Sequence, residues 1–432
     1  MKGYKNLSTS AENGAASLEI CMPNPRIGAK QHMPVIGPHR SSRNSTEQYA
    51  LCVNLFAIIV LLAGIRAAQA DTLSTPAMVG PLAANPNPID FDAGPLGTIY
   101  VTGVASGFAL WQTDPYSRDR DTRWDLGNAQ VIVQKTDGFV QFYVQAGQYD
   151  ILALGVPAVS SSYFSNHEFY FTNQAFGFLP QTYLKLAPTD NFSVEAGKLP
   201  TLIGDEDTFS FQNPNIERGL GWNQTNGQTR GIQANYTAGP VVLNLSWNDG
   251  YYSNRFDSIS GLATWTIDPS NTLAFLGAGN AGRSGTSTFI TPKLQNNQDI
   301  FDLMYTRTQG PWMLQPYVQY SHVPVDQVIG IDSSGSTWAA ALLAVYNLAP
   351  DWNLAGRAEY IGTSGGINLL DGPGSNAWSL TVTPTWQHNM VFVRTEGSYV
   401  AAEHTTAFET SFGANGTKST QLRALIEVGI IF

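Results

Sequence analysis

Three pairs of oppositely charged residues in the C-terminal part of the chain share an even spacing. They are Arg357 and Glu359, Arg394 and Glu396, and Arg423 and Glu427. Side chains two or four residues apart on a β-strand point to the same face of the sheet. Such groups would create a transverse field that orients dipolar solutes at the narrowest part of a pore. The competing interpretation is that they are solvated charges or paired struts that hold a wall in shape.

The same reasoning adds further charged side chains to the face that would line water. The complete predicted set is Lys185, Glu195, Asp302, Arg357, Glu359, Arg394, Glu396, Arg423 and Glu427. A second candidate is the 199–230 connection, which we expect to fold inward and narrow the pore through its acidic start. That start consists of Asp205, Glu206 and Asp207. The run lacks the spaced ligands and central glycine of a calcium loop, so we predict no metal site there.

Enzymatic chemistry has little support in the sequence. After the N-terminal 70 residues the only histidines are His167, His322, His388 and His404, and none has a metal-ligand spacing. Ser321 and His322 are adjacent and would point to opposite faces of a strand. We therefore predict no catalytic residues, no cofactor and no enzyme.

Short segments with a period of two, separated by turn residues, predict the elements that must position these charges. We predict sixteen strands at 98–111, 126–135, 138–147, 181–187, 192–198, 231–238, 241–248, 258–267, 272–279, 298–307, 312–322, 336–346, 352–361, 376–386, 390–399 and 420–432. Seven short and eight long connections alternate between them. The long 148–180 connection is rich in aromatic residues, so we expect it to pack into a barrel mouth or against a partner. An even number of antiparallel strands with this alternation is typical of outer-membrane barrels.

One face of each predicted strand is nearly free of charge. Trp378, Leu380 and Val382, for example, alternate with small hydroxyl residues. A soluble β-sandwich would also alternate, but its outer face would carry many charges. Tryptophan and tyrosine residues near the strand ends match the two aromatic girdles of a membrane barrel. The uncharged face is therefore predicted to contact lipid.

Composition and the N-terminus agree with an exported membrane protein. Only 13% of the 432 residues are charged, against about 25% in ordinary soluble proteins. Residues 51–65 form a short apolar run followed by Ala68-Gln69-Ala70, which predicts a signal peptide cleaved near Ala70. The predicted organisation is a leader (1–70), a proline-rich periplasmic lead-in (71–96) and a barrel (97–432).

The predicted mature chain is acidic. The leader holds seven of the 23 basic and three of the 33 acidic residues, so 16 basic and 30 acidic residues remain, a formal charge of −14. This balance argues against a nucleic-acid partner. Both cysteines, Cys21 and Cys52, lie in the leader. Disulfides and thiolate zinc sites are thereby excluded from the mature chain.

Two local motifs point to a family. The last predicted strand ends at Phe432, which resembles the assembly signal of bacterial outer-membrane barrels. The segments Gly197-Lys198-Leu199-Pro200-Thr201-Leu202-Ile203-Gly204-Asp205-Glu206-Asp207, Gln212-Asn213-Pro214-Asn215 and Trp247-Asn248-Asp249-Gly250-Tyr251 make the chain similar to the OmpL-like group of β-barrel porins. This resemblance runs from about residue 97 to 432 and implies an outer-membrane pore without a defined substrate.

The expected protein is thus an all-β, closed antiparallel transmembrane β-barrel of about sixteen strands, with short periplasmic turns and long extracellular loops. Barrels of this size leave an aqueous channel, so we expect passive diffusion of small polar solutes or ions. The alternative is a surface adhesin or receptor whose lumen is blocked and whose loops bind a partner. Expected partners are outer-membrane lipid and lipopolysaccharide, the solutes, and further copies of the chain in a trimer.

Overall fold

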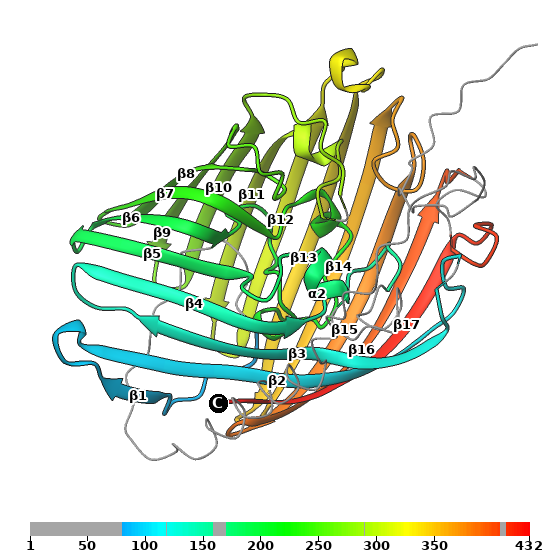
Figure 1. The fold of residues 1–432 in the computed structure, drawn as a ribbon. Helices are drawn as coiled ribbons and strands as arrows, with labels where there is room; N and C mark the ends of the chain where they lie inside the picture. The colour runs from blue at the N-terminus through cyan, green and yellow to red at the C-terminus, as the bar shows by residue number, and fades with distance from the viewer. Residues whose placement is uncertain (1–79, 118, 159–169, 289, 407–411) are drawn as a thin grey trace, which may run out of the picture.

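The computed structural model describes residues 80–117, 119–158, 170–288, 290–406 and 412–432. The predicted leader and the start of the lead-in lie outside these residues. Within them, sixteen strands form one antiparallel sheet that closes on itself (Figure 1). The predicted fold class is therefore confirmed. None of the helices in the described ranges has the length and apolar character needed to cross a bilayer.

The strands follow one another around the ring in sequence order. They are β2 (Thr98–Gln112), β3 (Thr122–Lys135), β4 (Val140–Tyr149), β5 (Gln181–Thr189), β6 (Phe192–Pro200), β7 (Gln228–Ala238), β8 (Val241–Asn248), β9 (Ser258–Asp268), β10 (Asn271–Asn280), β11 (Asp299–Gln309), β12 (Trp312–Val323), β13 (Gly335–Ala349), β14 (Trp352–Gly365), β15 (Asn376–His388), β16 (Val391–Glu403) and β17 (Thr420–Ile431). No boundary differs from the prediction by more than four residues. Short turns join the strands at one rim and long loops at the other.

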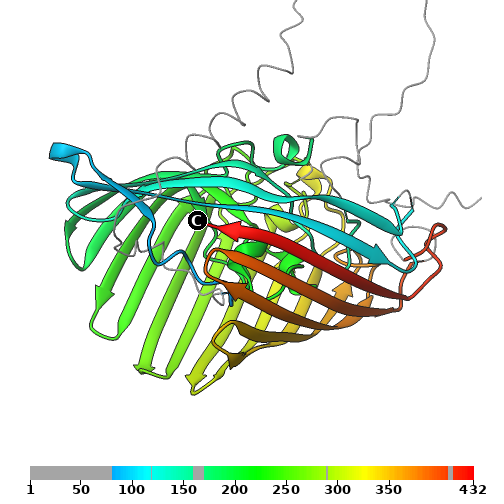
Figure 2. The same cartoon turned by 90° about the horizontal axis from the view of Figure 1, so that it is seen from below.

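The ring closes where the two ends of the barrel sequence meet. Strand β17 pairs with β2 from Arg423 opposite Gln112 to Ile431 opposite Val104. Beyond the last pair, Gly103 and Phe432 exchange two backbone hydrogen bonds. Figure 2 shows the C-terminus lying beside the start of β2. The terminal aromatic residue thus lies at the seam.

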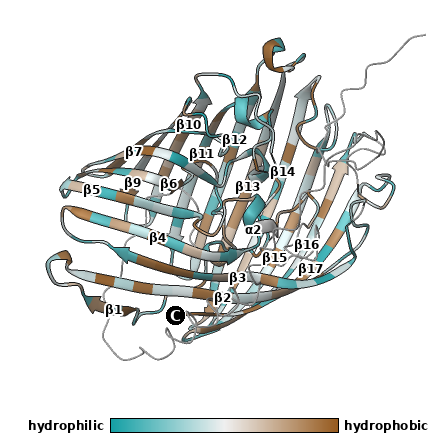
Figure 3. Ribbon diagram, viewed as in Figure 1, coloured by the Kyte–Doolittle hydropathy of each residue, from teal (hydrophilic) through white to brown (hydrophobic). Residues whose placement is uncertain are grey.

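Hydrophobic and hydrophilic residues alternate along many of the strands (Figure 3), and this alternation gives the barrel two different faces. On β15 the outward Trp378, Leu380 and Val382 are exposed, whereas the inward Ser379 and Thr381 are at most 2% exposed. Exposed tryptophans lie at both rims, Trp312 and Trp352 at the short turns and Trp111, Trp247 and Trp338 near the long loops. A belt of this kind fits a lipid bilayer with two interfaces.

A short strand at the short-turn rim was not predicted. Strand β1 (Ile89–Asp92) pairs with the first residues of β2 and is followed by the 3₁₀ turn η1 (Gly94–Leu96). The prolines of the lead-in argued against any ladder there. However, the four residues of β1 contain no proline and lie between Pro88 and Pro95, so their backbone groups are free to pair.

The long loops pack against one another inside the mouth of the barrel. Five of them contribute to one apolar group, here called the mouth cluster, which contacts the inner wall of β13–β16. Its loop members are Tyr116, Leu154, Leu220, Leu370 and Phe412. Phe176, from the aromatic-rich connection between β4 and β5, packs in a separate buried group with Tyr149 and Phe209. Tyr163, Phe164 and Phe169 of that connection lie outside the described residues. The remaining helices are short: α2 (Tyr170–Gln174), η2 (Ser210–Gln212), η3 (Gly221–Gln224), η4 (Gln295–Asn297) and η5 (Gln327–Ile329).

Candidate constriction site

The loop between β6 and β7, residues 201–227, crosses the inside of the barrel; we call it the crossing loop. Its two ends are adjacent, since Thr201 N donates to Gly227 O at 3.3 Å. Its apolar residues contact three different parts of the wall. Ile203 packs on β9–β12, Leu220 on β13–β16, and Ile216 on β2 and β17. The crossing loop is thus attached to several sides of the inner wall.

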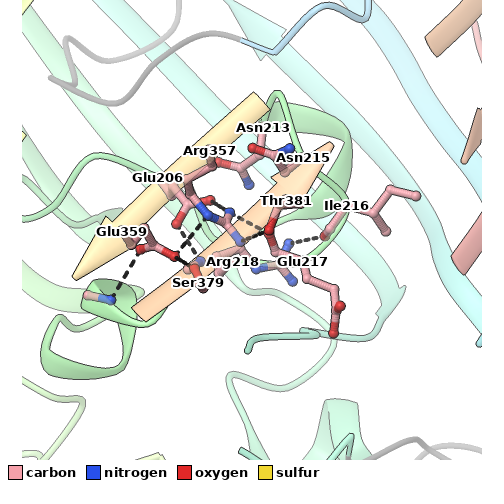
Figure 4. Close-up of polar contacts among 12 residues, drawn as sticks. Glu206, Asn213, Asn215, Ile216, Glu217, Arg218, Arg357, Glu359, Ser379 and Thr381 are labelled. Carbon is pink, nitrogen blue, oxygen red and sulfur yellow. Dashed lines mark hydrogen bonds and ion pairs between the residues drawn. The ribbon is translucent and has the colours of Figure 1, made fainter. Parts of the chain in front are cut away.

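Arg357 on β14 holds the middle of the crossing loop. Its Nη1 donates to Glu206 Oε1 at 2.5 Å and to the Glu217 carbonyl at 2.8 Å, and its Nε donates to Glu359 Oε2 at 3.1 Å. Figure 4 shows Arg357 between these groups and Thr381. Arg357 is 1% exposed, so the ion pairs are screened little by water. The Arg357–Glu206 pair is thus a buried ion pair between the wall and the loop.

Glu359 binds the same loop through backbone donors. Leu220 N donates to its Oε2 at 3.1 Å, and Ser379 Oγ donates to the same oxygen at 2.7 Å. A methyl group added at Gly219 would lie 2.0 Å from Glu359 Oε1. A side chain at this position would therefore displace the Glu359 carboxylate from its hydrogen bond with the loop.

Arg394 and Glu396 on β16 form a second attachment. Arg394 Nη2 pairs with Glu427 Oε2 of β17 at 2.6 Å, and the same guanidinium donates to the carbonyls of Ser210 and Asn213 at 2.9 Å. Glu396 accepts hydrogen bonds from two successive backbone amides of the loop, Ile216 N at 2.5 Å and Glu217 N at 3.0 Å. In each of these hydrogen bonds to the loop, the wall contributes a charged side chain. A charged donor or acceptor makes a hydrogen bond stronger.

Two further charged side chains of the wall, Arg423 and Asp302, also bind the crossing loop. Arg423 Nη1 on β17 pairs with Glu217 Oε1 at 2.7 Å and also donates to Ala153 O of the neighbouring long loop at 2.8 Å. Asp302 on β11 accepts a hydrogen bond from Gly204 N at 2.9 Å. The loop is therefore bound at opposite parts of the wall.

The nine charged residues predicted for the lumen thus fall into two groups. Seven contact the crossing loop: Asp302, Arg357, Glu359, Arg394, Glu396, Arg423 and Glu427. The other two, Lys185 and Glu195, pair with each other at 3.5 Å on β5 and β6, away from the loop. The Lys185 side chain is 30% exposed, and Glu195 is buried.

The acidic start of the crossing loop lies inside the barrel. Asp205 and Glu206 are buried, and Asp207 is partly exposed. Burial raises the pKa of Asp205 well above its ordinary value, and the neighbouring Glu206 carboxylate raises it further. In the part of the chain that the structure describes, no group of acidic, histidine or cysteine side chains could hold a metal ion.

Sequence reasoning missed Glu217 and Arg218 as site residues. Glu217 pairs with Arg423, whereas the buried Arg218 guanidinium lies 5.9 Å from the Trp222 ring and donates from Nη1 to Ile216 O. Adjacent opposite charges within a long loop that is otherwise poor in basic residues were the available signal. The significance of Glu217 depends on its contact with Arg423, which lies 206 residues later in the sequence.

The lead-in segment reaches the same loop from the short-turn side. Gly80 N donates to Gln212 O at 3.0 Å, and Leu82 packs with the inward-facing Val104 and Phe392. Ala83 exchanges two hydrogen bonds with the side-chain amide of Gln387. This segment therefore occupies space inside the barrel below the crossing loop.

A charge placed on the lead-in should displace it. We predict that Leu82→Asp raises the single-channel conductance of the purified protein, because an aspartate cannot remain buried against Val104 and Phe392 without a partner. Ala84→Asp, an exposed position two residues away, is the matched control and should leave the conductance unchanged. Equal conductance of both variants and the wild type would show that this segment does not obstruct the passage.

Asp150, at the start of the loop after β4, makes the stability of the folded protein depend on pH. Burial raises its pKa to about 8, with the Asp125 carboxylate as the second cause. The folded state therefore binds a proton that the unfolded chain releases above its ordinary pKa near 4, so stability falls as pH rises from about 4 to 8. We predict that thermal unfolding shifts to lower temperature between pH 5.5 and 8.5, and that Asp150→Asn reduces this shift. The same shift in both proteins would contradict the prediction.

Comparisons with known proteins agree with the barrel fold. The family described as "Putative beta-barrel porin-2, OmpL-like" matches residues 98–432. An anion-selective porin from Comamonas acidovorans is similar in structure, with a TM-score of 0.54 and 10% identity over 77% of this chain and 99% of that one. The outer-membrane channel DcaP of Acinetobacter baumannii gives a TM-score of 0.52 with 9% identity, over 77% and 97%. OmpT of Vibrio cholerae gives 0.51 with 11% identity, over 78% and 98%.

No curated protein matches the sequence significantly. The structural similarities, at these identities, establish the fold alone. The family match, in contrast, spans the whole barrel from β2 to the C-terminal residue. The chain therefore belongs to the OmpL-like family of β-barrel porins.

Proposed function

We propose that the protein is a narrow porin through which small polar solutes or ions diffuse passively across a bacterial outer membrane. The observation that carries the proposal is the crossing loop, held across a sixteen-stranded barrel by buried ion pairs with β14 and β17 and by hydrogen bonds to charged side chains of β16. A barrel of this size has room for an aqueous channel. The loop reduces that channel to a selective passage.

The half of the barrel nearer the short turns supports a water-lined entrance. Inward-facing Thr102, Gln141, Asn235, Thr306 and Asn353 are partly exposed there. These side chains are polar and uncharged. Beside them, the Lys185–Glu195 pair, with its partly exposed ammonium group, is a candidate for contact with passing ions.

Catalysis is not part of the proposal, and neither is a cofactor. His322 Nδ1 lies 2.9 Å from Ser336 Oγ, while the adjacent Ser321 points inward and bonds to Thr337. This is the opposed arrangement expected of neighbours on a strand. His388 lies 2.9 Å from Asp351 at the short-turn rim and is well exposed. These contacts place no serine beside a histidine–carboxylate pair.

A sealed barrel with partner-binding loops is the second candidate. The mouth cluster, which joins five loops, favours it, as does the burial of inward polar side chains such as Gln130, Gln145 and Gln233. In this case the barrel would present loops at the cell surface and conduct nothing. The two candidates predict opposite electrical behaviour.

Single-channel recording of the mature protein in planar bilayers separates the two. A steady unitary current supports the porin. Absence of current from protein that is folded, shown by its heat-modifiable migration on gels, supports the sealed barrel. A variant lacking the crossing loop must conduct in the same assay, so that failed insertion is not mistaken for closure.

We further propose export by a signal peptide cleaved near Ala70, and assembly into a trimer. One similar structure is a trimer form of OmpT from Vibrio cholerae. On this chain, Gly261 of β9 pairs with Gly277 of β10, and the neighbouring Ala263 is also small. This flat outer surface would suit a subunit contact. Light scattering of the detergent complex, corrected for detergent, tests the assembly, and a monomer would refute it.

A further inference from the structure

The outer surface of the barrel is hollowed near the long-loop ends of β5–β8. The hollow has a volume of about 540 Å³. It is lined by Leu179, Thr182, Gly197, Lys198, Arg230, Gly231, Ile232, Trp247 and Phe256. We call it the outer groove. It lies on the outward face of the sheet and is separate from the crossing loop.

Two glycines contribute backbone to the floor of the groove. Gly197 and Gly231 line it and are directly opposite each other on β6 and β7. Trp247 and Phe256 form one wall, and the Trp247 indole N–H fixes them together by donating to Phe256 O at 2.8 Å. The result is a preformed apolar slot at the surface expected to contact lipid.

Two cations stand at the loop end of the slot. Lys198 and Arg230 are the next directly opposed pair on β6 and β7 and share one face. Like charges in this position repel each other. Arg230 is neutralised by Asp249 at 2.7 Å, whereas the Lys198 ammonium donates to the carbonyls of Phe176 and Leu179 at 3.3 and 2.9 Å. Among the described residues no carboxylate pairs with Lys198, so the site keeps one uncompensated positive charge.

We propose that the outer groove binds a phosphorylated glycolipid of the outer leaflet, with one acyl chain in the slot and a phosphate at Lys198. The long loops of an outer-membrane barrel face the outside, which puts the cations at headgroup level and the slot below them. Ile232, Trp247 and Phe256 are each about half exposed, as expected for side chains that are covered by hydrocarbon. The groove is independent of the passage inside the barrel.

Native mass spectrometry of the detergent-solubilised protein tests the proposal, with bisphosphorylated lipid A and the dephosphorylated lipid of the same acyl chains as probes. Lys198→Gln should weaken lipid A binding about tenfold, as expected for loss of one charge-assisted contact. Ile232→Trp, which fills the slot, should weaken binding of both lipids. Arg307→Gln is the matched control, because Arg307 is an exposed cation on β11 near the short-turn rim.

The expected pattern is loss of lipid A binding in the first two variants, no loss in the control, and weaker binding of the dephosphorylated lipid to the wild type. Equal binding of lipid A by the wild type and Lys198→Gln would overturn the phosphate site. A stable oligomer that excludes lipid A would overturn the proposal as a whole and assign the groove to a second copy of the chain. Channel conductance should be the same in all three variants, so this test does not depend on the porin proposal.

Discussion

Replacing Arg394 by alanine is expected to detach the middle of the crossing loop and to raise single-channel conductance several-fold. The change leaves the Glu427 carboxylate buried without its guanidinium and frees the carbonyls of Ser210 and Asn213. Removing one partner of a buried ion pair costs about 3–5 kcal/mol. The strand ladders do not depend on this side chain, so the barrel should persist while the loop moves.

Two controls separate loop release from a change of charge. Arg307→Gln removes an exposed cation of β11 that does not contact the loop, and should leave the conductance close to the wild-type value. Arg394→Met combined with Glu427→Leu removes the hydrogen bonds of both side chains to Ser210 and Asn213 but leaves no buried carboxylate, so it should raise the conductance as Arg394→Ala does if loop release is the cause. Wild-type conductance and wild-type protease resistance of the Arg394→Ala loop would contradict the proposed attachment.

Removing the crossing loop should have the largest effect of all. Because Thr201 and Gly227 are hydrogen-bonded, a short Gly-Ser linker in place of residues 203–225 would close the chain without strain. The barrel would then lose the segment that fills it beside β9–β17. Conductance is expected to exceed that of Arg394→Ala, with less voltage-dependent closure.

The variant must be shown to keep its fold before the comparison is made. Heat-modifiable migration on gels and an unchanged β-sheet signal by circular dichroism are sufficient. If a folded loop-free barrel conducts no better than the wild type, the mouth cluster or the lead-in segment sets the narrowest point instead.

Most of the barrel could be predicted from local pattern. Alternation along the strands set the faces correctly, as at Trp378 and Ser379, because lipid and interior impose opposite requirements on neighbouring residues. Turn residues and loop lengths set the order of strands. Strand β1 was missed because the prediction rested on the many prolines of the lead-in as a whole. The four residues of β1 lie between two of those prolines and contain none.

The role of the inward charges could be predicted only in part. Even spacing places Arg357 and Glu359 on one face, but spacing does not distinguish a side chain that faces water from one that holds a loop. Glu206 lies 151 residues before Arg357 in sequence. The path of the crossing loop places Glu206 Oε1 2.5 Å from Arg357 Nη1. Arg357 and Arg394 contact the crossing loop, whereas the Lys185 side chain is partly exposed.

The most direct test of the account is the size limit for solutes in liposome-swelling assays, measured with a graded series of sugars. If the crossing loop defines the passage, the wild type admits only the smallest sugars, Arg394→Ala admits larger ones, and the loop-free barrel admits the largest. An identical size limit for all three proteins would show that the crossing loop does not define the passage.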